Sequence, residues 1–382
     1  MKLSHFQTFA PVCPVCRTQR GSDNALVIAN VFDGDDQVIQ HGMLHCSEAS
    51  CQHEYPIIDG IPIIVESLRT YLPQQLADLL YRTDLPADTL SLIGDCCGPG
   101  SEFDAKRQQL STYCWDHYGD LLPVDLREPP HSAFVSQTDQ ECSGSMTRVL
   151  HAALDRCSET IASGADLGPG PLLDVGCSVG RAAFELAARY QQPVLGIDIN
   201  LGMLRIAAKI LRDGLVRYDR RRVGMVYDRI EHELKFSAAE FVDFWACDAQ
   251  ALPFAENSVA GICGMNILDS IHSPTQLLFE ISRVLQPNSS VVLSCPYDWT
   301  PSATTVEQWI GGHSQRSVDG GAAEPMLRRL LSGTEPSIPL KLIDEQNLPW
   351  HLRLHSRSRV TYDCHVTLSQ KLAERQPAPT VQ

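Results

Sequence analysis

Two acidic residues and a turn of small residues have the types and spacing that suit ligand binding. The apolar segment 172–175 is typical of a buried parallel strand, and the turn at 176–180 reads Gly-Cys-Ser-Val-Gly. A helix is predicted for 181–190, and a second apolar strand, 194–197, ends at Asp198. Glycine lets the backbone approach a ligand closely, and an acid at the tip of the second strand can bind ribose hydroxyls. The pattern therefore predicts one β-α-β unit whose turn and terminal acid face a ligand.

The turn resembles motif I of class I S-adenosylmethionine (SAM) methyltransferases, D/E-x-G-x-G-x-G. Here the segment from Asp174 to Gly180 reads D-x-G-x-S-x-G, so Ser178 replaces the middle glycine. An ordinary strand-turn-helix of an α/β protein would look similar, because fold does not fix function. Taken alone, the turn leaves both interpretations open.

Segments after the turn favour the methyltransferase interpretation. Asp248 follows Asp198 by fifty residues in the stretch CDAQALPF, where the resemblance implies a contact with adenine. A strand at 258–263, a helix at 275–285 and a strand at 291–294 continue the β-α alternation. Agreement among several spaced elements favours the family over a chance match.

The resemblance implies an α/β fold with a Rossmann-like, seven-stranded class I methyltransferase sheet. The last two strands, expected at 340–343 and 360–368, would form its antiparallel pair. SAM is the implied cofactor. The residues implied to contact SAM are Asp174, Gly176, Cys177, Ser178, Gly180, Arg181, Asp198, Ile199, Asp248, Ala249 and Asn266.

A narrower resemblance concerns the methyl acceptor. The segments 294–301 (SCPYDWTP) and 307–312 (EQWIGG) resemble S-P-Y-x-W, T-P and W-x-G-G in the mercaptohistidine N-methyltransferase domains of ovothiol biosynthesis. The similarity covers about 110–370 of this chain. Here Cys295 is inserted before the proline and Asp298 replaces the usual residue, so the acceptor can differ. The implied acceptor is a small molecule, methylated on a nitrogen of a mercaptohistidine-like imidazole.

Methyl transfer requires a nucleophile held in line with an already activated sulfonium, so the protein mainly positions the acceptor. A nitrogen acceptor must be neutral or lose a proton, which a nearby base assists. In the implied fold, the fourth and fifth strands, expected at 258–263 and 291–294, end beside the methyl group of SAM. The catalytic candidates there are Asn266, Asp269, Tyr297, Asp298 and Trp299, and each could equally cap or pack a loop. Trp299 and Trp309 could stack on a flat or cationic acceptor.

Four cysteines near the N-terminus have a spacing that suits tetrahedral zinc. A C-P-x-C knuckle is followed about thirty residues later by C-x4-C, and the expected ligands are Cys13, Cys16, Cys46 and Cys51. The sequence YPIIDGIP at 55–62 resembles the small zinc-ribbon family that includes activators of tRNA and protein methyltransferases. Four ligands leave no open position, so a structural Zn²⁺ is expected. Four free cysteines remain the alternative, and His45 or His53 could replace one ligand.

Four parts of the chain are expected. Residues 1–68 would form the zinc-ribbon-like domain, 69–145 a helical bridge and linker, 146–371 the methyltransferase domain and 372–382 a disordered tail. Within the bridge, the aromatic residues Tyr113, Trp115, His117 and Tyr118 could cap the SAM site or pack in the core.

The arginine-rich segment 212–240 is longer than a normal connection. It carries five arginines between 217 and 229 followed by glutamates, which is typical of a solvated hairpin of mixed charge. The alternative is a lid whose guanidinium groups bind a substrate carboxylate.

Composition limits the partners and the location. A net charge of −15 over 382 residues argues against general binding of nucleic acid. No apolar run approaches the roughly eighteen residues that a membrane span needs, and the N-terminus lacks a signal-peptide h-region. The fourteen cysteines are scattered through the chain, which favours reduced thiols, so a cytoplasmic protein is expected. A homodimer stays open.

Two other functions stay open. A zinc-ribbon rRNA or tRNA base methyltransferase is favoured by the ribbon, but the acidic charge and the lack of a basic, aromatic-interleaved face oppose it. A non-catalytic SAM-binding partner protein is opposed by the intact acids and glycines of the motifs, which are Asp174, Gly176, Gly180, Asp198 and Asp248.

Overall fold

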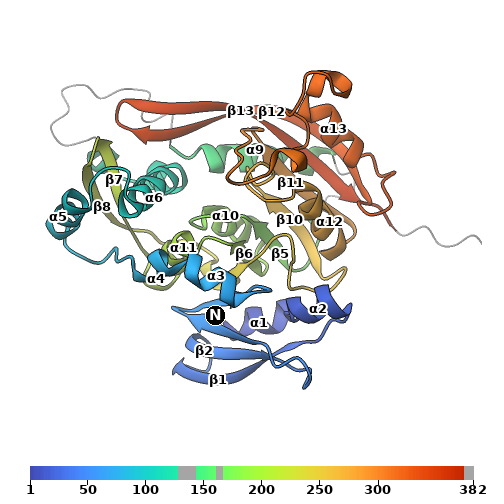
Figure 1. Cartoon of the computed structure of the whole chain (residues 1–382), viewed down its shortest axis with the longest axis horizontal. Helices are drawn as coiled ribbons and strands as arrows, with labels where there is room; N and C mark the ends of the chain where they lie inside the picture. Colours follow the sequence, from blue (N-terminus) through green and yellow to red (C-terminus); the bar gives the residue numbers. More distant parts are fainter. Residues whose placement is uncertain (128–142, 161–166, 374–382) are drawn as a thin grey trace, which may run out of the picture.

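The computed structural model describes residues 1–127, 143–160 and 167–373, and one large mixed sheet forms its centre (Figure 1). The strands are β1 Leu26–Gly34, β2 Ile39–Cys46, β3 Glu54–Ile58, β4 Ile61–Ile64, β5 Leu172–Val175, β6 Val194–Asp198, β7 Leu215–Val223, β8 Val226–Glu233, β9 Val242–Cys247, β10 Val259–Gly264, β11 Leu285–Cys295, β12 Leu340–His355 and β13 Ser358–Lys371. The α-helices are α1 Leu3–Phe9, α2 Pro14–Arg20, α3 Leu68–Gln74, α4 Leu76–Leu80, α5 Ala87–Cys97, α6 Glu102–Tyr118, α7 Val124–Arg127, α9 Ser145–Thr160, α10 Arg181–Tyr190, α11 Leu201–Asp213, α12 Pro274–Val284 and α13 Ala323–Leu330.

The sheet contains the seven-stranded arrangement that the sequence predicts. Its strands lie in the order β9-β6-β5-β10-β11-β13-β12, and all neighbours are parallel except the pairs that involve β13. From β5 the chain first builds β6 and β9 on one side and then β10 and β11 on the other. The predicted fold class is confirmed.

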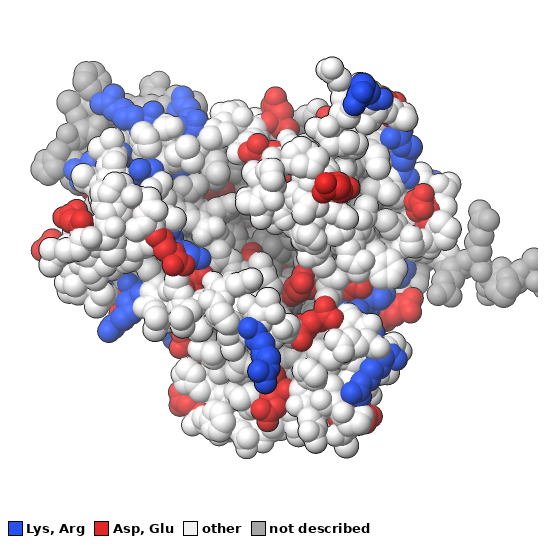
Figure 2. Space-filling view, viewed as in Figure 1, with Lys and Arg blue, Asp and Glu red and all other residues white. Residues whose placement is uncertain are grey.

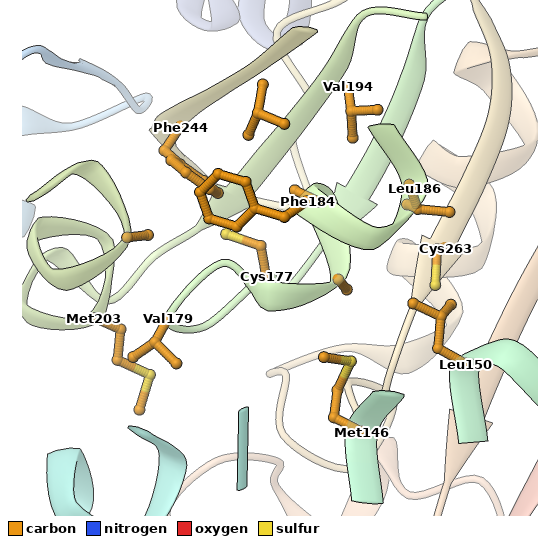
Figure 3. Close-up of a cluster of buried hydrophobic side chains, with 14 of the residues drawn as sticks. Met146, Leu150, Cys177, Val179, Phe184, Leu186, Val194, Met203, Phe244 and Cys263 are labelled. Atoms are coloured by element: carbon orange, nitrogen blue, oxygen red, sulfur yellow. The ribbon is translucent and has the colours of Figure 1, made fainter. Parts of the chain in front are cut away.

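Helices cover both faces of the sheet because its central strands are apolar on both sides. Leu172, Val194 and Phe244 pack on one face with α6, α9, α10 and α11, and Leu173 and Ile197 pack on the other with α1, α12 and α13. Figure 3 shows the first of these cores, where Phe184 of α10 meets Phe244 of β9 with ring centroids 5.7 Å apart. No helix in the described ranges is long and apolar enough to cross a membrane.

The N-terminal strands extend the same sheet. β4 pairs in parallel with β9, with Ile63 opposite Ala246 and Ile64 opposite Cys247, and β3, β2 and β1 continue outward to give eleven strands. Figure 1 shows this N-terminal unit packed beneath the central strands. The segment from 1 to 68 is therefore joined to the rest by backbone hydrogen bonds.

The arginine-rich segment forms an antiparallel hairpin, β7-β8, and its own carboxylates pair with its arginines. Arg217 binds Glu231 at 2.8 Å, and Arg229 binds Asp219 at 2.8 Å. Asp219 also binds Arg107 of α6 at 3.0 Å, which attaches the hairpin to the helical bridge. These contacts favour the hairpin interpretation over a lid that binds a substrate carboxylate.

The last strands are longer than the sequence suggests. β12 and β13 pair from Leu340 opposite Lys371 to His355 opposite Ser358, so most of the segment between the two expected strands, 344–359, is also strand. The alternation of apolar and polar residues at 350–355 is itself a strand signal, which the prediction of a shorter strand did not use. Most of the predicted linker and tail, at 128–142 and 374–382, lies outside the described residues.

Gly180 provides a test of how tightly α10 and α11 pack on β9. Its φ is 91°, and an added Cβ would lie 2.6 Å from Phe244 Cζ and 2.7 Å from Ala207 Cβ. Gly180→Ala is expected to lower the free energy of unfolding by about 1–3 kcal/mol more than Gly98→Ala. Gly98 is the matched control, because its φ is 81° and nothing lies within 4 Å of the position that an added Cβ would take. Equal losses of stability in urea unfolding would contradict this packing.

Candidate active site

A cavity of about 540 Å³ opens at the carboxyl ends of β5, β6, β9, β10 and β11. These strands lie on both sides of the point where the strand order reverses, which is the usual ligand site of an open α/β sheet. Figure 2 shows that this face of the molecule is hollowed near its centre. Of the eleven residues predicted to contact SAM, nine line the cavity: Asp174, Gly176, Cys177, Ser178, Asp198, Ile199, Asp248, Ala249 and Asn266.

The turn after β5 is held by backbone hydrogen bonds to β6. The N–H groups of Gly176 and Cys177 donate to Ile197 O, and the Ser178 N–H donates to Asp198 Oδ2 at 2.8 Å. Ser178 has a φ of 54°, a left-handed conformation in which the glycine of the related motif is unstrained. The serine hydroxyl donates a hydrogen bond to Met203 Sδ at 3.1 Å.

Gly180 and Arg181 are the two predicted contacts that do not line the cavity. Arg181 is 4% exposed and binds Glu185 at 2.6 Å, Asp120 at 3.3 Å and the carbonyl of His117 at 2.9 Å. Its guanidinium therefore ties α10 to the end of α6.

Three predicted catalytic residues lie together at the cavity. Asn266, Asp269 and Asp298 line it beyond β10 and β11. The Asp298 N–H donates to Asp269 Oδ2 at 2.7 Å, and Tyr362 Oη donates to Asp298 Oδ2 at 2.9 Å. Burial raises the pKa of Asp269, and hydrogen bonds from its neighbours oppose that shift.

The side chains of Tyr297 and Trp299 are not among those that line the cavity. Tyr297 Oη lies 2.7 Å from His365 Nδ1, and Trp299 stacks on Trp309 with ring centroids 5.9 Å apart. Tyr297 has a φ of 56°, a conformation that costs a bulky residue about 1–3 kcal/mol. This turn aims the backbone of Asp298 at Asp269 while the two aromatic rings face away.

Helix α6 brings further residues to the cavity. Tyr113 and His117 line it, whereas Trp115 and Tyr118 are buried in the core, so the aromatic cluster divides between the two predicted roles. That the lining residues cap SAM stays a prediction. Asp116 also lines the cavity, and its Oδ1 accepts a hydrogen bond from Ser145 N at 3.0 Å at the start of α9. No sequence pattern singles out Asp116, because the helix reaches the site only through tertiary packing.

The four predicted zinc ligands form one buried cluster whose sulfur atoms lie within 4.8 Å of one another. Cys13 Sγ is 3.7 Å from Cys51 Sγ, and Cys16 Sγ is 3.7 Å from Cys46 Sγ. Tetrahedral zinc with bonds of about 2.3 Å sets its sulfurs about 3.8 Å apart, while a disulfide needs about 2 Å. His45 and His53 are exposed and are not among the four clustered ligands, although His53 Nδ1 lies 3.3 Å from Cys51 Sγ.

Contacts connect the cysteine cluster to the loop that follows Asp248. Arg17 of α2 binds Glu280 of α12 at 3.0 Å, and Glu280 accepts a hydrogen bond from Leu252 N at 2.8 Å. Val12 N also donates to Pro253 O at 2.9 Å. The knuckle between Cys13 and Cys16 therefore supports the loop on the cavity's β9 side.

The central part of the chain is similar to known methyltransferases. Residues 173–293 match the family model described as a methyltransferase domain. Methyltransferase GfsG of Streptomyces halstedii is 25% identical over 203 residues, which cover 53% of this chain and 63% of that protein. The malonyl-[acyl-carrier protein] O-methyltransferase of a Methylovorus species is 30% identical over 131 residues, 34% of this chain and 37% of that protein. The chain thus spans less than two thirds of the length of these relatives.

The solved structures that align with this chain do so with low TM-scores and low sequence identity. A SAM-dependent methyltransferase of Methanosarcina mazei aligns with a TM-score of 0.35 at 20% identity and covers 53% of this chain and 93% of its own. The [4+2]-cyclase SpnF aligns with a TM-score of 0.38 at 16% identity and covers 70% of this chain and 97% of its own. The family match indicates a methyltransferase domain at residues 173–293.

The buried carboxyl of Asp116 gives a prediction about pH. Burial raises its pKa from 3.8 to about 7, so between these values the unfolded chain has lost a proton that the folded chain keeps. Stability therefore falls as pH rises through this window. Asp116→Asn is expected to reduce the fall in unfolding free energy between pH 5 and 8 by up to about 3 kcal/mol.

The slope does not vanish in this variant, because burial also raises the pKa of Asp174, to about 8. Urea unfolding at several pH values measures the effect, with the exposed Asp363→Asn as control. A slope in Asp116→Asn that equals that of the unaltered chain would show that Asp116 is ionised in the folded state.

Proposed function

We propose that this chain transfers the methyl group of SAM to a nitrogen of a small molecule, a mercaptohistidine-like imidazole. One observation carries the proposal: a single cavity exposes Asp198 and Asp248 on one side of β5 and Asn266, Asp269 and Asp298 on the other. The first side has the acids that the family pattern assigns to ribose and adenine. The second side has carboxylate and amide groups where a nitrogen nucleophile would be held. The resemblance of 294–312 to mercaptohistidine N-methyltransferase domains supports an imidazole as the methyl acceptor.

The residues of the cavity would have different roles in the reaction. SAM supplies a methyl group already activated by its sulfonium. Asp198 would accept hydrogen bonds from the ribose hydroxyls, and Asp248 would hold the adenine. As the C–N bond forms and the S–C bond breaks, an acceptor N–H proton would pass to Asp269, whose buried carboxylate binds a proton more readily than an exposed one. Asn266 would orient the acceptor by hydrogen bonding.

We further propose that Cys13, Cys16, Cys46 and Cys51 bind one structural Zn²⁺. The sulfur separations of 3.7 Å support this assignment. All four thiols are buried, and a full set of four ligands leaves zinc no position for substrate.

The proposed activity is tested with purified full-length protein, SAM and a panel of mercaptohistidine-like imidazoles beside total RNA, with products read by mass spectrometry. A methylated thioimidazole is the expected product. Methylation of RNA alone would replace the small-molecule acceptor by a nucleic acid and make the N-terminal unit the recognition element. Binding of SAM without turnover of any acceptor would favour a non-catalytic partner protein.

A substitution at Asp198 tests the cofactor site. Asp198→Asn removes a charged acceptor from the expected ribose contacts, and such hydrogen bonds contribute about 1.5–3 kcal/mol. The affinity for S-adenosylhomocysteine, measured by calorimetry, is expected to fall at least about tenfold. The matched control is Asp363→Asn, an exposed carboxyl that does not line the cavity. Unchanged affinity in Asp198→Asn would place the cofactor elsewhere.

Removal of the metal gives an independent prediction. Metal analysis is expected to find one zinc per chain and none in the Cys13→Ser/Cys16→Ser double variant. Because the knuckle supports the loop after Asp248, this variant should also bind S-adenosylhomocysteine several-fold more weakly. The control is Cys96→Ser/Cys97→Ser, which alters two exposed cysteines. Full zinc content in the double variant would contradict the ligand assignment.

A further inference from the structure

The side chains that line the cavity include many acidic groups and few basic ones. Six aspartates line it, and no lysine or arginine does so among the described residues. Figure 2 shows acidic side chains beside the central hollow of this face. A ligand set with a net negative charge would be disfavoured here, because carboxylates in a partly closed cavity interact strongly with other charges.

SAM accounts for only part of this negative charge. Its sulfonium and ammonium outweigh its carboxylate by one positive charge, and Asp174, Asp198 and Asp248 lie at the ends of the strands assigned to it. Three carboxyl groups remain, Asp116, Asp269 and Asp298. They come from α6 and from the loops after β10 and β11, on the side proposed for the acceptor.

Asp116 has unused capacity to bind a ligand. The residue is fully buried, and its Oδ1 is taken by the N–H of Ser145. Its Oδ2 has no hydrogen-bond partner among the described residues. A buried acceptor oxygen without a partner is costly, so a donor that enters the cavity would gain from reaching it.

Aromatic rings accompany these carboxyl groups. Tyr113, Trp350 and Tyr362 line the cavity, and Tyr362 also binds Asp298. Tyr113 lies near enough to Asp198, Asp116 and Asp269 for their charges to add to the effect of burial in raising its pKa. Carboxylates together with aromatic faces form a typical site for an organic cation.

We propose that the acceptor carries a cationic ammonium-type group, held by Asp116, Asp269 and Asp298 between Tyr113 and Tyr362. This inference rests on the proposed function and names the charge class of its substrate. An acceptor with a free phosphate, a nucleic-acid strand or an acidic acyl carrier would meet no lysine or arginine among the described residues that line the cavity. An amino-acid acceptor would place its ammonium among these carboxylates.

The same charge selects the atom that is methylated. When a neutral nitrogen attacks the methyl group, the nitrogen gains positive charge as the C–N bond forms, and nearby carboxylates stabilise that charge. Its proton then leaves to a carboxylate or to water. A thiolate or carboxylate nucleophile instead enters as an anion and is repelled. The cavity therefore favours N-methylation over S- or O-methylation.

The test compares two imidazole probes of opposite charge on the full chain saturated with S-adenosylhomocysteine. Histamine carries an ammonium, and imidazole-4-acetate carries a carboxylate. Calorimetry at pH 7.5 is expected to show at least about tenfold tighter binding of histamine, which corresponds to about 1.4 kcal/mol. Equal binding, tighter binding of the acetate, or no binding of histamine overturns the inference.

Variants of Asp116 and Asp298 test whether these residues cause the preference for histamine over imidazole-4-acetate. Asp298→Asn, at an exposed position of the mouth, and Asp116→Asn, in the interior, are each expected to remove most of the preference for histamine, whereas Asp363→Asn keeps it. Retention of the full preference in both cavity variants overturns the assignment. Binding of S-adenosylhomocysteine is measured first: its absence overturns the proposed function, while its presence without a charge preference overturns only this inference.

Discussion

The reversal of strand order at β5 is the constraint on which the site depends. The chain leaves β5 in one direction to build β6 and β9 and then returns to build β10 and β11 on the other side. Parallel strands end at one edge, so Asp174, Asp198 and Asp248 meet Asn266 and Asp269 across a single crevice. The strands can form this edge only because they are apolar on both faces and buried between two helical layers.

The N-terminal unit stabilises the same edge of the sheet, because its strand β4 pairs with β9. β4 covers the side of β9, whose exposed N–H and C=O groups would otherwise invite pairing with another chain. The contacts of Arg17 and Val12 then carry this support to the loop after Asp248. A cysteine cluster distant from the acceptor side can thereby influence the cofactor side without touching a ligand.

Local sequence signals predict the elements whose chemistry and periodicity are local. The turn after β5 and the four cysteines can be read from spacing alone. Contacts made by folding cannot: the β4–β9 pairing, the length of β12 and β13, and the unpartnered Oδ2 of Asp116 depend on residues far apart in the chain. The orientation of Tyr297 and Trp299 depends on a left-handed backbone conformation, which a tyrosine does not signal.

The most direct test of the proposed site is a crystal structure of the full chain with S-adenosylhomocysteine bound. The ribose hydroxyls are expected on Asp198, the adenine beside Asp248 and Ala249, and the homocysteine sulfur directed toward Asn266 and Asp269. A ligand bound outside this crevice, or a crevice that stays empty at saturating concentration, would contradict the assignment of the cavity as a methyl-transfer site.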